Sequence, residues 1–401
     1  MNGAARMRAA WRNGVRLDGP AARAALALVL AAGVFVAWRI GARQWPVIAS
    51  GNKVFSDLFA HWSYAGFAAA HPGPAIYDRE AMSAFQHGLF DGRLQGLPFA
   101  YPPPYLFLVL PLAAFTVWHA ALLWGAASLA AFAAAIAPRP WRADPLAPSL
   151  LVLAILAPST IVCLGYGQNG LLIAALLAGG LRLLPTRPGW GGVLLALACV
   201  KPQMAVLLPV ALLAGRQWRA IAAAVATGLL LVLASAAWIG PLAWIDWIAA
   251  LREQGDYAAR WIGPHRQPTV AATMTLFGMD RASGLAVQAA VTTAVVLGVV
   301  AAWRRGPSAA AAGAVLAGAL LATPYGFNYD LPVATAAVAA LVAGRRRVSW
   351  PEAAVMAATL LLPMVLHLTS RFFWTAPVTL AALFVLCVWR ACSEQERLFF
   401  F

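Results

Sequence analysis

Asp57 is the first residue of this chain whose setting suggests chemistry. It follows the first hydrophobic stretch and lies among aromatic residues in the segment Phe55-Ser56-Asp57-Leu58-Phe59-Ala60-His61-Trp62. Partial loss of hydration at such a place raises the pKa of a carboxylate and makes it a better general base. The alternative is that Asp57 is simply hydrated in an exposed loop, as most loop aspartates are.

Lys201 is the second such residue. The chain has 29 basic residues, of which only Lys53 and Lys201 are lysines, and Lys201 lies inside an apolar stretch. An ionisable group in such a stretch is costly and therefore indicates a functional site, and an ammonium group suits a lipid phosphate. The alternative is a lysine near a helix end whose charged group reaches toward the membrane surface.

Other polar side chains have both a functional and a structural interpretation. Gln168 and Asn169 either form a polar turn or hydrogen-bond the hydroxyls of a sugar, for which amides are well equipped. His61 is either a second proton-transfer group or a packing residue. The further predicted substrate contacts are Tyr101, His265, Arg266, Tyr325, Asn328, Tyr329 and Asp330. Tryptophans such as Trp62, Trp244, Trp247 and Trp261 are expected in an interfacial belt, although some could stack on a sugar.

Several kinds of site have no motif in the chain. There is no Asp-x-Asp pair for a metal-bound nucleotide sugar, no phosphate-binding P-loop and no Gly-x-Ser-x-Gly nucleophile motif. The four cysteines show no metal-ligand spacing, which argues against a zinc site and a disulfide framework. We therefore expect neither a metal ligand set nor a cofactor.

The composition predicts an all-α polytopic membrane protein. Hydrophobic residues make up 62% of the 401 residues and charged residues only 11%. Because lipid offers no hydrogen bonds, spanning segments must satisfy their backbone internally, as helices do. Apolar segments are expected to form helices near residues 24–38, 105–136, 147–163, 170–184, 220–239, 284–303, 308–323, 329–344, 351–368 and 372–390.

Arginine clusters between these segments predict the topology. The net charge of +15 comes from such clusters, which mark cytoplasmic turns, so nucleic-acid binding is not expected. The first apolar run is expected to be an uncleaved signal anchor. Residues 42–100 and 240–281 then form two extracytoplasmic loops of a single domain over 1–401, with interfacial helices near 55–70 and 79–90.

Two intervals depart from simple crossings. Residues 105–136 contain two hydrophobic pieces, and either one or three crossings fit the arginine pattern. The interval between Arg187 and Arg216 is too short for two full spans, which need about 40 residues. Lys201-Pro202-Gln203 lies in its middle. We expect a broken helical hairpin there, whose tip lines a cavity that opens to the outer face.

The order of several motifs resembles glycosyltransferase family 87, once catalogued as domain of unknown function 2029. The matching pieces are Ser56-Asp57, Tyr77-Asp78, Tyr101-Pro102-Pro103, Gly167-Gln168-Asn169, Gly192 through Lys201-Pro202, Arg216-Gln217-Trp218-Arg219 and Thr323-Pro324-Tyr325. The resemblance implies a GT-C fold of about 11–12 transmembrane helices. It also implies an inverting transferase that takes mannose from polyprenyl-phosphate-mannose, with Asp57 as base and Lys201 as phosphate contact. Asn328-Tyr329-Asp330 stands where many members have a histidine.

The functional hypothesis is thus an inner-membrane enzyme whose active site faces the periplasm. It would move a hexose from a polyprenyl-phosphate donor to a lipid or glycan acceptor. Two other interpretations remain open at this point. Polar groups in a broken-helix cavity also suit a lipid or sugar transporter or flippase, and a polymerase or ligase of surface polysaccharide would act on the same face.

Overall fold

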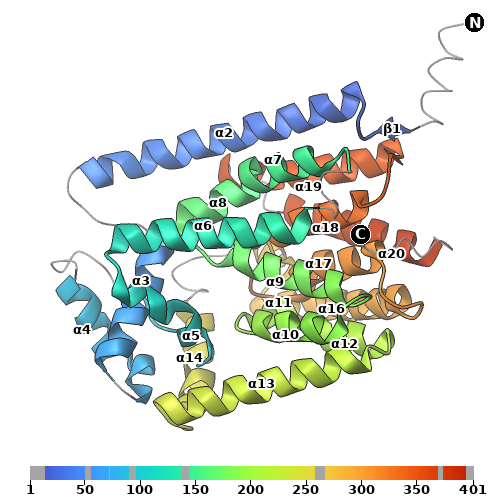
Figure 1. Cartoon of the computed structure of the whole chain (residues 1–401). Helices are drawn as coiled ribbons and strands as arrows, with labels where there is room; N and C mark the ends of the chain where they lie inside the picture. Colours follow the sequence, from blue (N-terminus) through green and yellow to red (C-terminus); the bar gives the residue numbers. More distant parts are fainter. Residues whose placement is uncertain are drawn as a thin grey trace, which may run out of the picture.

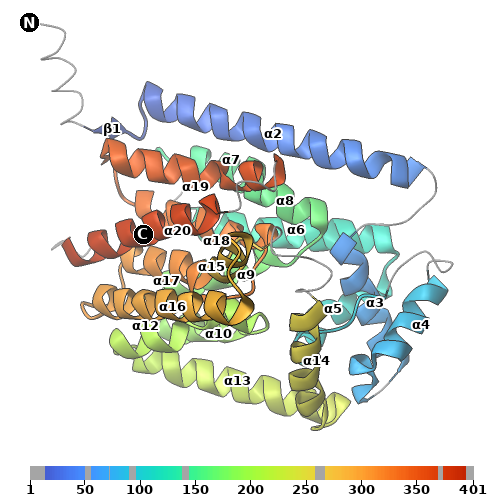
Figure 2. The same ribbon diagram turned by 180° about the vertical axis from the view of Figure 1, so that it is seen from behind.

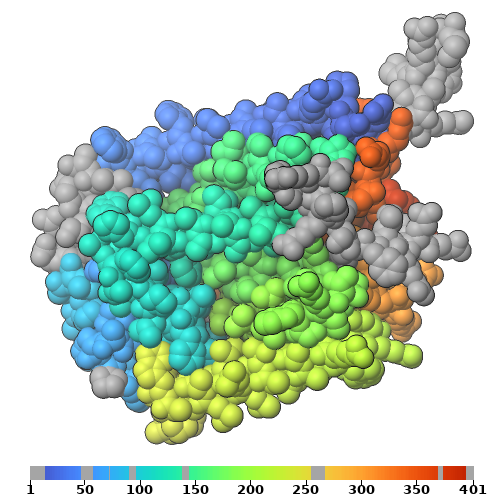
Figure 3. Space-filling model, in the orientation of Figure 1, coloured from blue at the N-terminus to red at the C-terminus, as the bar shows by residue number. Residues whose placement is uncertain are grey.

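The computed structural model describes residues 14–49, 56–71, 73–89, 96–137, 144–257, 267–368 and 374–393. Its long helices run side by side along one direction, which is horizontal in Figure 1. Helix α2 (Pro20–Ala49) lies along one edge and α13 (Trp218–Ile239) along the opposite edge. The space-filling view in Figure 3 shows the same two helices on opposite borders of the molecule. The prediction of an all-α polytopic membrane protein is confirmed.

Seven helices within the described residues are long and apolar enough to cross a membrane: Pro20–Pro46, Val117–Ile136, Ala147–Tyr166, Trp218–Ile239, Arg281–Trp303, Trp350–Leu368 and Thr375–Ser393. These correspond to α2, α6 (Val117–Ile136), the pair α7 (Ala147–Leu156) and α8 (Pro158–Tyr166), α13, α16 (Arg281–Trp303), α19 (Trp350–Leu368) and α20 (Thr375–Ser393). Large apolar side chains on α13 face outward, with Leu230 and Leu233 each 66% exposed. An exposed apolar face of this kind is unfavourable in water but favourable in contact with lipid.

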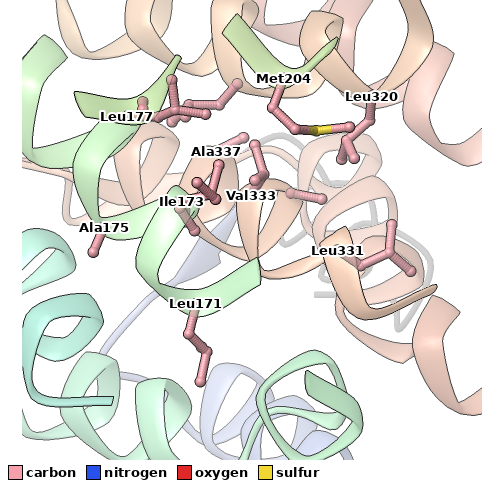
Figure 4. Packing of buried hydrophobic residues seen from close by; sticks show 14 of the residues in the cluster. Leu171, Ile173, Ala175, Leu177, Met204, Leu320, Leu331, Val333 and Ala337 are labelled. Carbon is pink, nitrogen blue, oxygen red and sulfur yellow. The ribbon is translucent and has the colours of Figure 1, made fainter. Parts of the chain in front are cut away.

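Shorter apolar helices form the centre of the bundle. They are α9 (Gly170–Leu183), α17 (Ala309–Ala322) and α18 (Pro332–Val342), and every residue of α17 is buried. Figure 4 shows Ile173 and Leu177 of α9 on the side that faces Val333 and Ala337, with Met204 and Leu320 nearby, whereas Leu171 points away from them. A helix of 14 residues is about 21 Å long and does not reach across a hydrocarbon core of about 30 Å. Polar turns at the ends of these helices can therefore lie recessed within the molecule.

The predicted broken hairpin consists of α10 (Pro188–Ala198), α11 (Pro202–Ala205) and α12 (Leu208–Ala214). Lys201 has φ −124° and ψ 76°, outside the helical region, and Pro202 follows it as the first residue of α11. A residue before proline is disfavoured in the α conformation, and proline tolerates the first turn of a helix because that N–H has no intrahelical partner. The Lys-Pro pair therefore follows the end of α10 at Ala198 and starts α11.

Short helices gather at the left end of the molecule in Figure 1. They are α3 (Ser56–Ala70), η1 (Pro74–Tyr77), α4 (Arg79–Leu89), α5 (Tyr105–Val109), η2 (Leu110–Ala114) and α14 (Ala243–Tyr257), whereas the short α15 (Val270–Leu276) packs against α16 nearer the middle of the molecule. Figure 2 shows α14 inclined steeply to α13 and α16. Helices α3 and α4 occupy the two segments predicted to be interfacial. The interval 105–136 contains one long helix, α6, preceded by the short α5 and η2.

The other end of the molecule, here called the arginine end, is formed by the starts of α2 and α19 and a small sheet. Strand β1 (Val15–Arg16) pairs antiparallel with β2 (Arg347–Val348), which the sequence did not predict. The pairing places Arg16 at the same end as the cluster Arg345-Arg346-Arg347. This agrees with the assignment of both segments to one side of the membrane. Helix α2 also continues to Ala49, beyond the predicted end at Trp38.

Candidate active site

A cavity of about 540 Å³, here called the active-site cavity, lies where α3, α14 and the broken hairpin meet. This volume falls within the range of about 300–1,000 Å³ typical of small-molecule sites. The lining includes apolar residues of the segment 97–102 and of α14 together with polar side chains. The polar and aromatic lining residues are Asp57, His61, Tyr64, Tyr101, Gln168, Lys201, Gln203, Tyr325, Phe327 and Tyr329.

Asp57 lies in the first turn of α3 and is partly buried in the cavity wall. Loss of hydration raises the pKa of its carboxyl group above the usual value. A hydrogen bond from Gln168 and the positive charge of Lys201 favour the ionised form and act in the opposite direction. The Asp57 carboxylate therefore binds a proton more readily than an ordinary aspartate, while Gln168 and Lys201 still favour its ionised form.

Gly167 is the residue that brings Gln168 to Asp57. It ends α8 in the left-handed conformation, with φ 65°. A Cβ atom at this position would lie 2.5 Å from the Cβ of Leu58, which is next to Asp57 in α3. Glycine thus satisfies two local demands, a left-handed helix end and a close approach of two chain segments. The sequence analysis left open whether Gln168 and Asn169 form a polar turn or bind a sugar, and here the turn that holds them packs against the start of α3.

Lys201 forms the centre of a buried polar network and is 4% exposed. Its Nζ donates to Oδ1 of Asp330 at 2.5 Å and to Oδ1 of Asn169 at 3.1 Å. The second carboxylate oxygen of Asp330 accepts from the backbone N–H of Phe327 at 3.0 Å. An ammonium group has three N–H donors, and these two contacts account for two of them. Lys201 therefore reaches the active-site cavity with donor capacity for a ligand.

The network continues through Asn169 to the aromatic side of the cavity. Asn169 Nδ2 donates to the Tyr105 hydroxyl at 3.3 Å, and this hydroxyl lies 3.1 Å from Nδ1 of His61. Burial, together with the charge of Lys201, lowers the pKa of His61 to about 3. His61 is therefore neutral at physiological pH. Its Nε2 atom is buried and has no hydrogen-bond partner among the described residues.

Two tyrosines form a flat platform beside His61. The rings of Tyr101 and Tyr105 are stacked, with centroids 3.9 Å apart and planes inclined by 13°. The Tyr101 ring lies 5.8 Å from that of His61, centroid to centroid. Three consecutive prolines, at positions 102–104, separate the two tyrosines and lead into α5. The rigid turn fixes both rings, and Tyr101 faces the cavity.

Comparison with known families identifies the chain. Residues 99–324 match the model of glycosyltransferase family 87, which is more than half of the chain. The protein belongs to glycosyltransferase family 87. No curated protein and no solved structure matches it. The cavity described above is therefore the candidate active site of a family 87 glycosyltransferase, although Asp57 and Asp330 lie outside the matched residues.

The structure brings most of the predicted site residues of this family 87 member together. Seven of them line the active-site cavity: Asp57, His61, Tyr101, Gln168, Lys201, Tyr325 and Tyr329. Asn169 and Asp330 lie behind the wall and bind Lys201. Asn328 is directed elsewhere, because its Nδ2 donates to the carbonyl of Pro363 at 3.3 Å. Arg266 and His265 lie outside the described residues.

Some residues of the family 87 site were not predicted. Tyr105 links His61 to Asn169, and Tyr64 and Gln203 line the active-site cavity. For two of these residues, the spacing from a predicted site residue could have indicated their role. Tyr105 follows Tyr101 by four positions across the proline run, and Gln203 follows Lys201 by two across the helix break. Tyr64 has no comparable signal, because it is one of several aromatic residues in α3.

Proposed function

We propose that the active-site cavity catalyses an inverting transfer of a hexose, mannose, from a polyprenyl-phosphate sugar to a hydroxyl of a lipid or glycan acceptor. The observation that carries the proposal is the meeting of Asp57 and Lys201 in one cavity wall. The charge of Lys201 acts on the ionisation of Asp57, so the two groups are electrostatically coupled. A proton acceptor and a cation at one cavity are the two groups that such a transfer needs.

The surroundings of the two carboxylates favour Asp57 over Asp330 as the base. Asp330 is 1% exposed, and both of its oxygens are engaged, one by Lys201 and one by the Phe327 N–H. Asp57 instead lines the cavity, and loss of hydration raises its pKa. A general base must be within reach of the proton that it removes, and only Asp57 of this pair meets that requirement.

The proposed reaction has one concerted step. The carboxylate of Asp57 takes the proton of the acceptor hydroxyl, and the hydroxyl oxygen forms a bond to the anomeric carbon. On the opposite face, the bond from that carbon to the phosphate oxygen breaks, and the lipid phosphate leaves with the electron pair. Lys201 stabilises the negative charge that grows on the phosphate. Attack and departure on opposite faces invert the configuration of the anomeric carbon.

The neighbouring polar groups have positioning roles in this proposal. Asp330 and Asn169 hold the Lys201 ammonium at the cavity wall, and Gln168 orients the Asp57 carboxylate. The low pKa of His61 argues against an acid–base role at neutral pH, and we assign its neutral ring to contact with sugar hydroxyls. Tyr101 and Tyr325 supply further wall for the sugar. Because Lys201 supplies the positive charge, the proposed step uses no metal and no other cofactor.

The proposed location is the plasma membrane of a cell that also has an outer membrane, with the cavity facing the periplasm. The support is the distribution of charge along the bundle. Arginines cluster at the arginine end, whereas the active-site cavity lies near α3 and α14 at the other end (Figures 1 and 2). Basic residues favour the cytoplasmic side, which would direct the cavity outward. A polyprenyl-phosphate donor would then enter the active-site cavity from the lipid.

The decisive experiment is the substitution Asp57→Asn. Membranes containing the variant are supplied with labelled polyprenyl-phosphate-mannose and an acceptor lipid extract. We expect a loss of transfer of about 10³-fold or more, because the amide cannot accept the proton. The melting temperature should not fall, because burial disfavours the ionised carboxylate that the substitution removes.

Asp246→Asn is the matched control, since Asp246 lies on α14 at the same end but does not line the active-site cavity. It should retain nearly full transfer. Near-normal transfer by Asp57→Asn would remove Asp57 from the mechanism. A wild-type protein that moves labelled lipid across vesicles but forms no glycosylated product would instead support a transporter.

A further inference from the structure

A second cavity, here called the apolar groove, lies at the arginine end. Its volume is about 400 Å³, and it runs between α2, α7, α18 and α19 beneath the β1–β2 pair. The lining is almost entirely apolar and includes Leu26, Val29, Leu153, Val342 and Leu360. This groove is remote from the active-site cavity, because β1 and α3 lie toward opposite ends of the molecule in Figure 1 and again in Figure 2.

Positive charge is concentrated at one end of the groove. Arg23 is the only charged residue among the described residues that line it. Arg346 is exposed on the adjoining segment, and its carbonyl accepts from the N–H of Leu17, another lining residue, at 3.0 Å. The nearby acids make their hydrogen bonds to other arginines, although the charge of Arg346 also acts on Asp18. Asp18 accepts two hydrogen bonds from Arg16, and Glu352 accepts from Arg390.

The length of the groove along α2 fits a hydrocarbon chain that extends from the membrane surface into the membrane. Its lining residues on α2 run from Ala21 to Val29, a distance of about 12 Å along the helix. Arg23 lies near the start of this interval, in the first turn of α2, and the deeper positions are apolar. The groove therefore combines a cationic rim with an apolar interior that extends along the bundle. That combination is complementary to an amphiphile with an anionic head and a hydrocarbon tail.

We propose that the apolar groove binds an anionic phospholipid, with one acyl chain along α2 and the phosphate group between Arg23 and Arg346. Basic sites between transmembrane helices at the membrane surface recognise anionic headgroups in this way. A peptide partner would have to bring its own negative charge to the rim and bury an apolar segment at bilayer depth. The lipid already supplies both features at that place. The bound chain would fill the space between α2 and the α7–α19 side of the bundle.

The test uses full-length protein that has been stripped of lipid in detergent. Phosphatidylglycerol or phosphatidylcholine is added, and bound lipid is counted by native mass spectrometry. We expect wild-type protein to bind one phosphatidylglycerol roughly tenfold more tightly than phosphatidylcholine. The double variant Arg23→Gln/Arg346→Gln should lose this preference and retain its affinity for phosphatidylcholine, because each arginine near the surface favours an anionic lipid.

Two further variants keep the test specific. Arg187→Gln/Arg219→Gln removes the same charge from exposed positions that do not line the groove, and it should bind phosphatidylglycerol like wild type. Ala357→Trp places a large side chain in the groove and should weaken binding of both lipids at an unchanged melting temperature. Equal binding of the two lipids by wild-type protein would overturn the proposal. An unchanged preference in Arg23→Gln/Arg346→Gln, or formation of a dimer through this face with no lipid bound, would do the same.

Discussion

The two ends of the bundle differ in whether their charged residues face a cavity or lie at exposed turns and helix ends. At the active-site end, Lys201 and Asp330 are 4% and 1% exposed and lie within a network that reaches the cavity. At the arginine end, Arg187, Arg219 and Arg346 are exposed at the ends of helices or in turns. Exposed arginines of this kind cost little and bias the orientation of the chain. Buried charges cost much more, so the buried Lys201–Asp330 pair beside a cavity indicates a functional site at that end.

Glu352 shows that burial of a charge does not by itself indicate catalysis. It is 3% exposed at the arginine end, where one oxygen accepts from the Ser349 N–H and the other from Arg390. Ser349 and Glu352 have the spacing of a capping box, which satisfies free backbone donors at the start of α19. The carboxylate thus serves a helix end. The Lys201–Asp330 pair differs because its lysine also lines a large cavity.

The largest expected effect is that of breaking this pair. Lys201→Met leaves Asp330 buried without its cation, and we expect a loss of about 3–5 kcal/mol in the free energy of unfolding. Transfer activity should fall at least 10²-fold, because the leaving phosphate loses its positive partner. Thermal unfolding in detergent and transfer from labelled polyprenyl-phosphate-mannose measure the two effects.

The double variant Lys201→Met/Asp330→Leu separates stability from activity. Replacing both charges by apolar groups of similar size is often neutral or stabilising, so the melting temperature should recover. Transfer should remain low, because no cation faces the phosphate. Recovery of both properties would show that Lys201 acts only in folding.

Gly167→Ala should have a smaller effect on the same end. The new Cβ atom would meet Leu58 at 2.5 Å, and φ 65° is unfavourable for alanine. We expect a loss of about 1–3 kcal/mol in stability and a reduction in transfer of roughly tenfold, because the starts of α3 and α9 must move apart. Gly66→Ala is the control, since Gly66 lies within α3 and its Cβ would be at an ordinary 3.5 Å from the ring of Phe85 in α4. Equal loss in both variants would contradict the special role of the Gly167 turn.

Much of this architecture was predictable from the spacing of apolar residues. The break at Lys201-Pro202 followed from the short interval between Arg187 and Arg216 and from the restriction that proline imposes. Helices α3 and α4 followed from two short amphipathic segments between the first span and the proline run. These features are local, so the sequence within a few residues decides them.

The remaining features depend on contacts between distant parts of the chain. The ion pair that holds Lys201 joins residues 129 positions apart, and Tyr105 reaches Asn169 across 64 positions. The complete burial of α17 was also not predictable, because lipid-facing and protein-facing helices are equally apolar in sequence. The same limitation explains why the apolar groove had no signal in the sequence. Its cationic rim depends on the pairing of β1 with β2, which brings the segment of Arg346 beside Leu17.

The pH dependence of transfer should distinguish Asp57 from its neighbours. Because burial raises the pKa of Asp57 and the base must be ionised, activity should increase with pH through that raised value. The acid limb of kcat/KM should therefore lie above about pH 4, where an ordinary aspartate titrates. His61, whose pKa is about 3, should contribute no limb near pH 6.5. A limb at or below about pH 4, measured in vesicles at constant ionic strength, would argue against Asp57 as the base.

The smallest expected effect comes from removing charge at the arginine end. Arg187→Gln/Arg219→Gln should change the free energy of unfolding by less than about 0.5 kcal/mol per site, because both side chains are exposed. Transfer should also be unchanged, since neither residue lines the active-site cavity. The matched change at the other end, Lys201→Gln, removes a single charge and should reduce both properties. Comparable losses in the two variants would mean that Lys201 matters no more than an exposed arginine, which would contradict its proposed role in the active-site cavity.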